Sequence, residues 1–567
     1  MIPLTIQKAR HLLSHGLITS QELVVYCHNI LLAGENVWGL NAFSQRTSLD
    51  ELMVLAEQSD ERRRHGQALS PLDGIPISIK SNLAVQSHPL TAGSRILGET
   101  RKSTPVVGYD ATVVKSLKDA GGIIFGTTTM DEFGMGSLGS NTVSGPAKNP
   151  LPYLQQIPTA STIELDNPQK MNDPQHTAQI IKSSSEEIHE LHHASFLHFT
   201  ESGMVDRAPG GSSCGSAISV AHGSSLISLG SDTGGSVRLP AAWTGVVGLK
   251  PTYGRLSRHG LVSYASSLDT VGILARSSRC VALTLQELVN RSKMKSNKDS
   301  NYDVSSPLSC NLLQETNGGP GSGLSGIRIG VPEAFSVKEC NDRIRAHWSN
   351  ALEHLEAQGA VIHMVDTTEL SPQILQTSLA AYYVLVSAEA SSNLARYDGF
   401  RYGAGANRQD ALDEWDKFSS ETSFSLLEHQ FARARSKGLG PEVIRRILNG
   451  NAVLSSDRFH TYYEAAAKLR AALTHQMHAS LENYDALLVP SSIVSPPPQI
   501  DKHMDSMDMY ANDVMTVPAS LAGLPAVSVP IRVGDDDNDT FAFQPAVQLI
   551  GSRMQEGKLL EIASHLQ

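Results

Sequence analysis

The stretch LGSDTGGSVR, residues 229–238, places one serine directly behind two glycines, and no histidine occurs in the twenty residues that follow. Glycine has no Cβ, so a turn at Gly234-Gly235 lets the main chain approach a ligand closely. Consecutive amides that converge on one oxygen form an oxyanion hole. The pattern predicts a nucleophile at Ser236, and an oxyanion hole made by the amides of Thr233, Gly234, Gly235 and Ser236.

Without a histidine, the base that this serine needs is best sought in a lysine. Lys80 ends the apolar segment GIPISIK, residues 74–80, which we expect to be a buried strand. Burial disfavours the ammonium form and lowers a lysine pKa below its usual value of about 10.4. Ser212 could relay the proton between Ser236 and Lys80, a variant of triad chemistry. The residues alone leave open that these glycines and serines only form a loop or a phosphate cradle.

A second candidate site is HELHH, residues 189–193, which matches the zinc-peptidase pattern H-E-x-x-H. His189 and His193 would be the ligands and Glu190 the base. Such a site needs a rigid, buried helix and a third ligand. This segment has no apolar stripe to bury, so we interpret it as a solvated histidine-rich tract and predict no metal site.

The composition excludes several classes of protein. The formal net charge of −11 disfavours a broad electrostatic contact with nucleic acid. The five cysteines are scattered, without a C-x-x-C pair, and predict neither a disulfide framework nor a zinc knuckle. No run of about 18 apolar residues is present, so we expect no membrane insertion.

Strand and helix patterns alternate along the chain and indicate an α/β fold with a mostly parallel sheet. The segment TSQELVVYCHNILLAG begins with a capping-box pattern, Thr19 three residues before Glu22. We expect long helices at 371–397 and 457–481 and a helix at the C-terminal end. Two stretches interrupt the pattern: a polar one at 152–205, predicted to loop out or be disordered, and a flexible surface connection at 291–325.

The N-terminal residues allow two interpretations. The first acidic residue is Glu22, and basic residues precede it, which is a weak feature of an organellar presequence. The segment TIQKARHLL is equally well explained as the first helix of the fold, and we favour that interpretation.

Residues 208–255 closely resemble the signature block of the amidase signature family, whose members hydrolyse amides with a Ser, cis-Ser, Lys triad. Carried over residue by residue, the resemblance implies that Ser236 is the acyl-ester nucleophile, Ser212 the cis-serine relay and Lys80 the base. It also implies one large α/β domain, residues 1–567, with a central twisted mixed β-sheet covered by helices on both faces. Cys214 departs from the family pattern, because a glycine is common at this position.

Within that family, the chain is most similar to the glutamine-hydrolysing subunits of tRNA-dependent amidotransferases. The similarity rests on three long stretches, 248–272, 387–403 and 509–530. It implies a B-type partner subunit, a small third subunit of C or F type, and tRNA bound through the partner. It implies no cofactor on this chain, with ATP and Mg²⁺ used at the partner. The departures and the N-terminus suggest a fungal mitochondrial form in the matrix, or a cytoplasmic protein if bacterial.

The same resemblance implies a glutamine site in which Arg446 binds the α-carboxylate, Asp513 the α-ammonium, and Tyr382 lines the pocket. Each charged residue has a structural alternative. Arg446 could pair with Arg445 on a helix surface, and Asp513 could cap the following helix. Asp232 and Arg238 flank the predicted turn and are expected to hold it. The runner-up function is a free-standing amidase that acts on a small carboxamide.

Overall fold

The computed structural model describes residues 4–98, 106–154, 173–175, 177–179, 181–182, 205–293, 308, 323–399, 402, 425–498, 510–531 and 544–567. The two predicted interruptions, 152–205 and 291–325, lie mostly outside these residues. The same is true of the whole HELHH segment. Among the described residues, no helix is long and apolar enough to cross a membrane.

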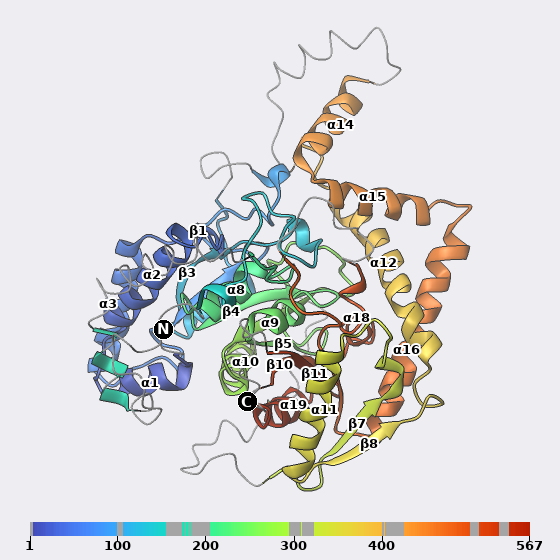
Figure 1. The fold of residues 1–567 in the computed structure, drawn as a ribbon. Coiled ribbons are helices and arrows are strands. Elements are labelled where there is room, and N and C mark those ends of the chain that lie inside the picture. Colours follow the sequence, from blue (N-terminus) through green and yellow to red (C-terminus); the bar gives the residue numbers. More distant parts are fainter. Residues whose placement is uncertain are drawn as a thin grey trace.

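One mixed β-sheet of 11 strands organises the described chain, in the order β1-β3-β2-β4-β6-β5-β10-β11-β9-β7-β8. Figure 1 shows it running through the middle of the molecule. The strands are β1 Phe43–Arg46, β2 Pro76–Lys80, β3 Ile123–Thr128, β4 Ile227–Asp232, β5 Val247–Lys250, β6 Thr270–Ala275, β7 Arg328–Pro332, β8 Val361–Val365, β9 Ala486–Pro490, β10 Ala526–Pro530 and β11 Ala546–Ile550.

The expectation of a mostly parallel sheet was wrong, whereas the mixed sheet implied by the family resemblance is confirmed. Parallel pairs occur only toward the two sides, in β3-β2-β4 and β9-β7-β8. The strands between them, from β4 through β6, β5, β10 and β11 to β9, all pair antiparallel. Crossover helices explain the parallel sides, but the connections between central strands return the chain in the opposite direction.

Helices cover both faces of the sheet, as successive residues of β6 show. Leu274 packs with Ala217 and Ala241 of two helices, while its neighbour Ile273 belongs to the core cluster that contains Leu285. The helices are α1 Ile6–Ser14, α2 Ser20–Asn36, α3 Leu49–Arg64, α4 Thr112–Asp119, α5 Leu151–Leu154, α8 Cys214–His222, α9 Arg238–Thr244, α10 Ser278–Lys293, α11 Asp342–Ala357, α12 Pro372–Leu394, α14 Leu426–Gly438, α15 Pro441–Val453, α16 Glu464–Asn483, α18 Val517–Leu521 and α19 Glu556–Ser564.

The predicted elements are largely confirmed. Thr19 and Glu22 form the expected capping box of α2, which runs on to Asn36. Helix α1 buries Ile6, Ala9, Leu12 and Leu13, so this segment is the first helix of the fold. A π-helical turn, Phe459–Tyr463, precedes α16, and the helix predicted at 457–481 is therefore α-helical only from Glu464.

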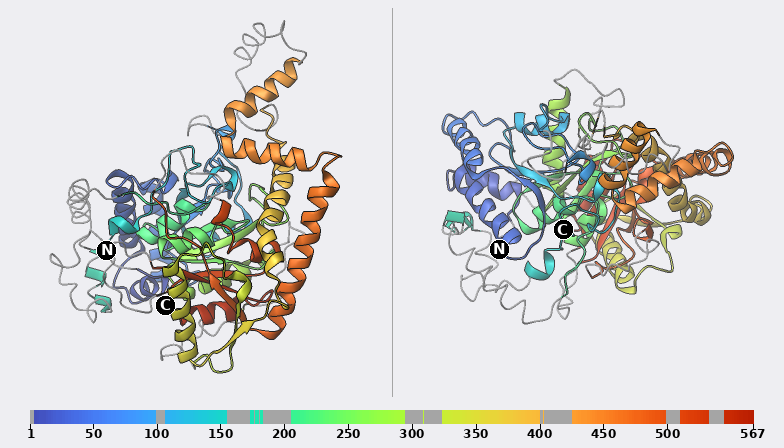
Figure 2. Two further views of the ribbon diagram at one scale, coloured as in Figure 1. Left: turned by 45° about the vertical axis from the view of Figure 1, so that its right-hand side comes forward. Right: turned by 90° about the horizontal axis from the view of Figure 1, so that it is seen from above.

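Two groups of helices lie at opposite sides of the molecule. In Figure 1, α1, α2 and α3 lie on one side, and α12, α15 and α16 lie on the other. Helix α14 projects from the body in both Figure 1 and Figure 2, and none of its residues is buried. Helix α12 packs on both α15 and α16, and the apolar side chains of these three helices share one core cluster with those of α18.

Candidate active site

Lys80 is the last residue of β2, a strand whose five residues are all buried. Strands β2 and β4 are parallel neighbours, so their carboxyl ends meet at one edge of the sheet. The turn that carries Ser236 follows β4 directly, which explains how Lys80 and this turn come together across more than 150 positions. Burial lowers the pKa of Lys80 to about 8, and the nearby carboxylate of Asp131 only partly counters this effect.

The Lys80 ammonium nitrogen is surrounded by hydroxyl and carbonyl oxygens. Its Nζ donates to Ser212 Oγ at 2.8 Å, to Ser231 Oγ at 3.0 Å and to the Ser231 carbonyl at 3.3 Å. A neutral amine has two N–H groups and one lone pair, so Ser231 can accept both protons while the lone pair faces Ser212. The arrangement suits a lysine that takes a proton from Ser212.

Ser212 and Ser236 are neighbours through the main chain. The peptide bond between Gly211 and Ser212 is cis, and the Ser213 amide donates to the Ser236 carbonyl at 3.1 Å. Within the described residues, the Ser236 hydroxyl makes no hydrogen bond, and none joins it to Ser212 Oγ. Ser236 is partly exposed, whereas Lys80 and Ser212 are fully buried. The structure thus joins the predicted base and relay directly and leaves the predicted nucleophile open to a ligand.

A side chain outside the turn holds the turn before Ser236 by a hydrogen bond. Three of the amides in this turn have no protein acceptor among the described residues. The Thr233 hydroxyl donates to Asp269 Oδ1 at 2.8 Å. In the described part of the chain, the amides of Gly234, Gly235 and Ser236 have no protein acceptor. A Cβ at Gly234 would lie 2.5 Å from the Tyr382 hydroxyl, so only glycine fits beneath this ring. Unoccupied amides beside a partly exposed hydroxyl are what an oxyanion hole requires.

Asp232 and Arg238 close this turn, as expected. Arg238 Nε and Nη2 donate to the two Asp232 carboxylate oxygens at 3.0 and 2.8 Å, and the Val237 amide donates to Oδ2 at 3.1 Å. Burial alone would raise the pKa of Asp232, but the Arg238 guanidinium holds it below its usual value. Arg238 also donates to the Thr516 carbonyl and to Gln548 Oε1, at 2.7 and 2.6 Å. The pair therefore ties the turn to α18 and β11.

Arg446 is buried on α15 inside a cage of tyrosines. Its guanidinium carbon lies 5.8, 5.2 and 5.7 Å from the ring centroids of Tyr264, Tyr383 and Tyr510. Nε donates to Glu442 Oε1 at 2.8 Å, and Nη1 donates to the Tyr264 hydroxyl. Its Nη2 has no acceptor among the described residues. The surface-pair alternative with Arg445 fails, because Arg445 is half-exposed while Arg446 is buried.

Asp513 does not cap α18, whose N-cap residue is Thr516. Its Oδ2 accepts a hydrogen bond from the Tyr383 hydroxyl at 2.8 Å. Burial raises the pKa of Asp513 to about 6, with the Tyr383 bond and Arg446 acting against the rise. Arg446 lies over the ring of Tyr383, and Asp513 accepts a hydrogen bond from the hydroxyl of the same tyrosine. Tyr383 therefore contacts both a cation and an anion. The pair has the charges that an α-amino acid would need.

Tyr382 connects the two halves of the site. Its hydroxyl lies over Gly234 of the turn, and its ring meets that of Tyr383 edge-on at 5.1 Å. The charged pair and the Ser236 turn are therefore separated by two consecutive tyrosines of α12. All predicted residues are brought to one region of the molecule.

Sequence reasoning missed several neighbours of these groups. Ser231 lies five residues before Ser236 and accepts from Lys80, but nothing in its spacing distinguishes it from the other serines. Glu442 precedes Arg446 by four residues, and this helical ion-pair spacing was a usable signal. The caging tyrosines come from segments far apart in the chain, so only the fold identifies them: Tyr264, Tyr383 and Tyr510.

Cys214 starts α8 beside the lysine without disturbing it. Its thiol donates to the Thr129 carbonyl at 3.4 Å, and burial raises its pKa. The residue is therefore a neutral thiol at physiological pH, and the replacement of glycine leaves both Ser212 and Lys80 in contact.

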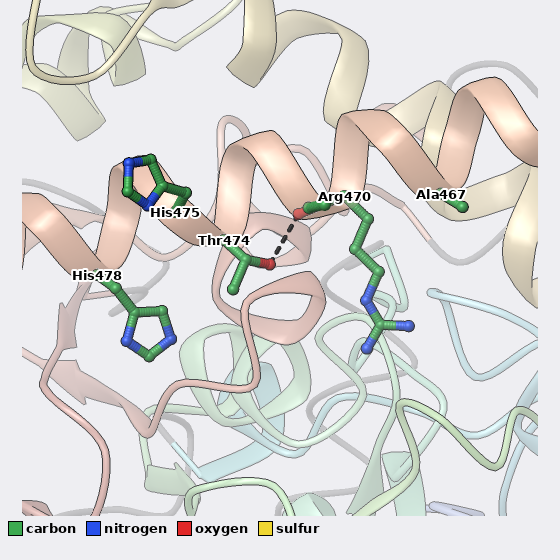
Figure 3. Close-up of a pocket in the computed structure, with 6 residues that line it drawn as sticks. Ala467, Arg470, Thr474, His475 and His478 are labelled. Atoms are coloured by element: carbon green, nitrogen blue, oxygen red, sulfur yellow. Dashed lines mark hydrogen bonds between the residues drawn. The ribbon is translucent and has the colours of Figure 1, made fainter.

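Outside this region, two of the described histidines line a cavity. A shallow cavity of about 510 Å³ lies along α16, where Figure 3 shows Arg470, Thr474, His475 and His478. Arg470 is committed to the Leu521 carbonyl and to Ser267. Among the described residues, no group of three or more His, Cys, Asp or Glu side chains could hold a metal ion.

Comparison with known proteins shows which family this chain resembles. A family model described as Amidase matches residues 24–161 and 198–560. The chain is 35% identical to the A subunit of the glutamyl-tRNA(Gln) amidotransferase of Chlorobaculum tepidum, covering 91% of this chain and 89% of the relative. It is 34% identical to the protein of the same name from Salinibacter ruber, covering 99% and 98%.

Solved structures of amidases have a similar fold. The crystal structure of the A subunit of glutamyl-tRNA(Gln) amidotransferase from Thermotoga maritima superposes with a TM-score of 0.59 at 31% identity, covering 87% of this chain and 83% of that one. The peptide amidase of Stenotrophomonas maltophilia shares the fold, with a TM-score of 0.63 at 21% identity, covering 99% and 96%. The match over most of the sequence and the shared fold show that this chain belongs to the amidase signature family.

Proposed function

We propose that this chain is the A subunit of a glutamyl-tRNA(Gln) amidotransferase. It hydrolyses glutamine through an acyl-enzyme on Ser236 and supplies ammonia for the ATP-dependent conversion of Glu-tRNA(Gln) to Gln-tRNA(Gln). The observation that carries the proposal is the 2.8 Å contact between a fully buried Lys80 and Ser212, at the foot of the Ser236 turn. The relatives of that name at about 35% identity support the choice of substrate.

Acylation begins when Ser236 Oγ attacks the side-chain carbonyl carbon of glutamine. The Ser236 proton passes to Ser212 Oγ as the Ser212 proton passes to the lone pair of neutral Lys80. The oxyanion that forms is stabilised by the amides of Thr233 through Ser236. When the carbon–nitrogen bond breaks, Lys80 returns its proton through Ser212 to the departing nitrogen, and ammonia leaves.

Deacylation uses the same groups in reverse. A water molecule loses a proton through Ser212 to Lys80 and attacks the ester carbon, and the bond to Ser236 Oγ breaks. Ser236 regains its proton, and glutamate is released. Each cycle consumes one glutamine and one water, and it forms one glutamate and one ammonia.

Glutamine is selected by the charged pair around Tyr383. Arg446 pairs with the α-carboxylate through its free Nη2, Asp513 pairs with the α-ammonium, and Tyr382 forms the wall between these groups and the Gly234 turn. A simple carboxamide lacks both α-substituents and would leave the charges of Arg446 and Asp513 without their partners. This feature favours glutamine over the runner-up, a free-standing amidase for small carboxamides.

The remaining parts of the proposal follow from the relatives. The chain works with a B-type subunit, which holds ATP, Mg²⁺ and tRNA, and with a small third subunit of C or F type. We propose the mitochondrial matrix as its location, on the basis of the departures from the family pattern, such as Cys214, with the cytoplasm as the alternative. Imaging of the tagged chain in its own cells tests the location.

Ammonia release is the experiment that tests the function. The full chain should release ammonia from glutamine, faster with its partner subunits than alone, and Ser236→Ala should abolish the release. Faster turnover of simple amides than of glutamine, without any effect of partners, would instead identify a free-standing amidase.

A further inference from the structure

Glu132 is a buried carboxylate that the proposed mechanism does not use. It lies in the short 3-10 turn η2, Glu132–Gly134, between the catalytic serines and the start of α15. Both of its carboxylate oxygens accept hydrogen bonds from groups of other segments. Its position raises the question of what a buried anion does so close to the glutamine site.

One side of this contact fixes the beginning of α15. The Gly440 amide donates to Glu132 Oε2 at 2.7 Å, and Gly440 is the N-cap residue of that helix. The Ser94 hydroxyl donates to the other oxygen, Oε1, and lies 3.3 Å from the Gly438 carbonyl. A Cβ at Gly440 would overlap Oε2, so the absence of a side chain permits this close approach. Helix α15 makes no side-chain cap of its own.

The same turn also contacts Ser212, the proposed relay serine. The Asp131 amide donates to the Ser212 carbonyl at 3.3 Å, and the Gly134 amide donates to the Asp131 carbonyl at 2.9 Å. A Cβ at Gly134 would lie 3.6 Å from Ser212 Oγ and 3.8 Å from Tyr264. Four consecutive residues, 131–134, therefore contact both the relay serine and the helix that carries Arg446.

The distance along α15 from Gly440, which Glu132 holds, to the charged residue Arg446 is short. Arg446 follows Gly440 by six residues, which a helix spans in about 9 Å at 1.5 Å per residue. Gly440 and Arg446 belong to one continuous helical segment, so a change in how Gly440 is held alters the position of Arg446. Helix α15 packs on α12, which carries Tyr382 and Tyr383, but its N-terminal end has Glu132 as its buried side-chain partner.

We infer that Glu132 is a positioning residue for glutamine specificity. It fixes the position of the N-terminal end of α15 and thereby the distance between Arg446 and Ser236. The inference rests on the proposed function, since it assigns Arg446 to the α-carboxylate. Glu132 touches neither substrate nor the reacting atoms. Its removal should therefore weaken glutamine binding and leave the serine chemistry intact.

Steady-state glutaminase kinetics of the full chain, co-expressed with its partner subunits, test this role. Glu132→Ala should raise KM for glutamine about tenfold or more, because a misplaced binding group is costly, while kcat changes less than about threefold. Glu132→Gln should keep KM close to the wild-type value, since the glutamine amide oxygen can accept from Gly440 and its NH₂ can donate to Ser94. Ser94→Ala, a milder change, should raise KM in the same direction by about threefold.

A double-mutant cycle shows whether Glu132 acts through Arg446. In an Arg446→Ala background, Glu132→Ala should raise KM less than about twofold, because the group that it positions is gone. Equal effects in both backgrounds, an unchanged KM for both Glu132→Ala and Ser94→Ala, or a fall in kcat alone would overturn the inference. Failure of the wild-type complex to hydrolyse glutamine would instead refute the proposed function.

Discussion

Lys80 Nζ lies 2.8 Å from Ser212 Oγ, and both residues are fully buried. Ser231 supplies two further oxygens to the same nitrogen. Burial lowers the pKa of this lysine to about 8, so the neutral base is more populated near neutral pH than it would be in an exposed lysine. In the proposed mechanism, a hydroxyl relay and a lysine of shifted pKa take the role of a histidine base, which is absent from the twenty residues after the Ser236 turn.

The pH dependence of glutamine hydrolysis should report this lysine. Neutral Lys80 is the active form, so kcat/KM should rise as pH increases and level off above about pH 8. Measurements from about pH 6 to about pH 9 in a buffer series of constant ionic strength check this. A flat profile over that range, or one that falls toward alkaline pH, would exclude Lys80 as the base.

Asp513 should control affinity for glutamine and not the chemical step. Asp513→Asn keeps a side chain that can accept from Tyr383 but loses the charge, and KM should rise roughly ten- to hundredfold with kcat little changed. Because the pKa of Asp513 is raised to about 6, KM of the wild type should also rise as pH falls through this value. Tyr383→Phe, which removes only the hydroxyl, is the matched control and should have a smaller effect.

Arg238 should be needed for stability. Arg238→Met leaves Asp232 buried without its cation, and the free energy of unfolding should fall by about 3 to 5 kcal/mol in urea titrations. The control is Arg64→Met, which breaks an exposed ion pair with Glu61 and should cost less than about 1 kcal/mol. Similar losses for the two variants would show that the Asp232–Arg238 pair does not hold the turn.

Residues 162–197, which the family model does not match, should be dispensable for glutamine hydrolysis. A variant that lacks them, with a short glycine-serine linker, should keep the wild-type kcat, and chelators should not inhibit either protein. Loss of activity with chelator, or stoichiometric zinc that disappears with the deletion, would revive the HELHH site.

The local elements could be predicted where one segment carries its own signal. The capping box of α2 and the buried strand before Lys80 are examples, because caps and apolar runs act within a few residues. Strand direction was predicted less well. The sequence pattern of β5, β6, β10 and β11 is that of any buried strand, and only the pairing shows them to be antiparallel.

The candidate site, like the fold, has parts that could be predicted from the sequence and parts that could not. The grouping of Lys80, Ser212 and the Ser236 turn was predictable from their motifs together with a family resemblance. The cage around Arg446 was not, because Tyr264, Tyr383 and Tyr510 belong to three separate segments that meet only in the folded chain. The role of Glu132 likewise depends on an amide more than 300 positions away, at Gly440.

Trapping of the acyl-enzyme tests the central claim most directly. The complex is mixed with glutamine, quenched rapidly in acid, digested and analysed by mass spectrometry for the peptide that contains Ser236. The account predicts a γ-glutamyl ester on Ser236, absent from Ser236→Ala and strongly reduced in Lys80→Ala. An ester on another residue, or glutamine hydrolysis that survives Ser236→Ala, would contradict it.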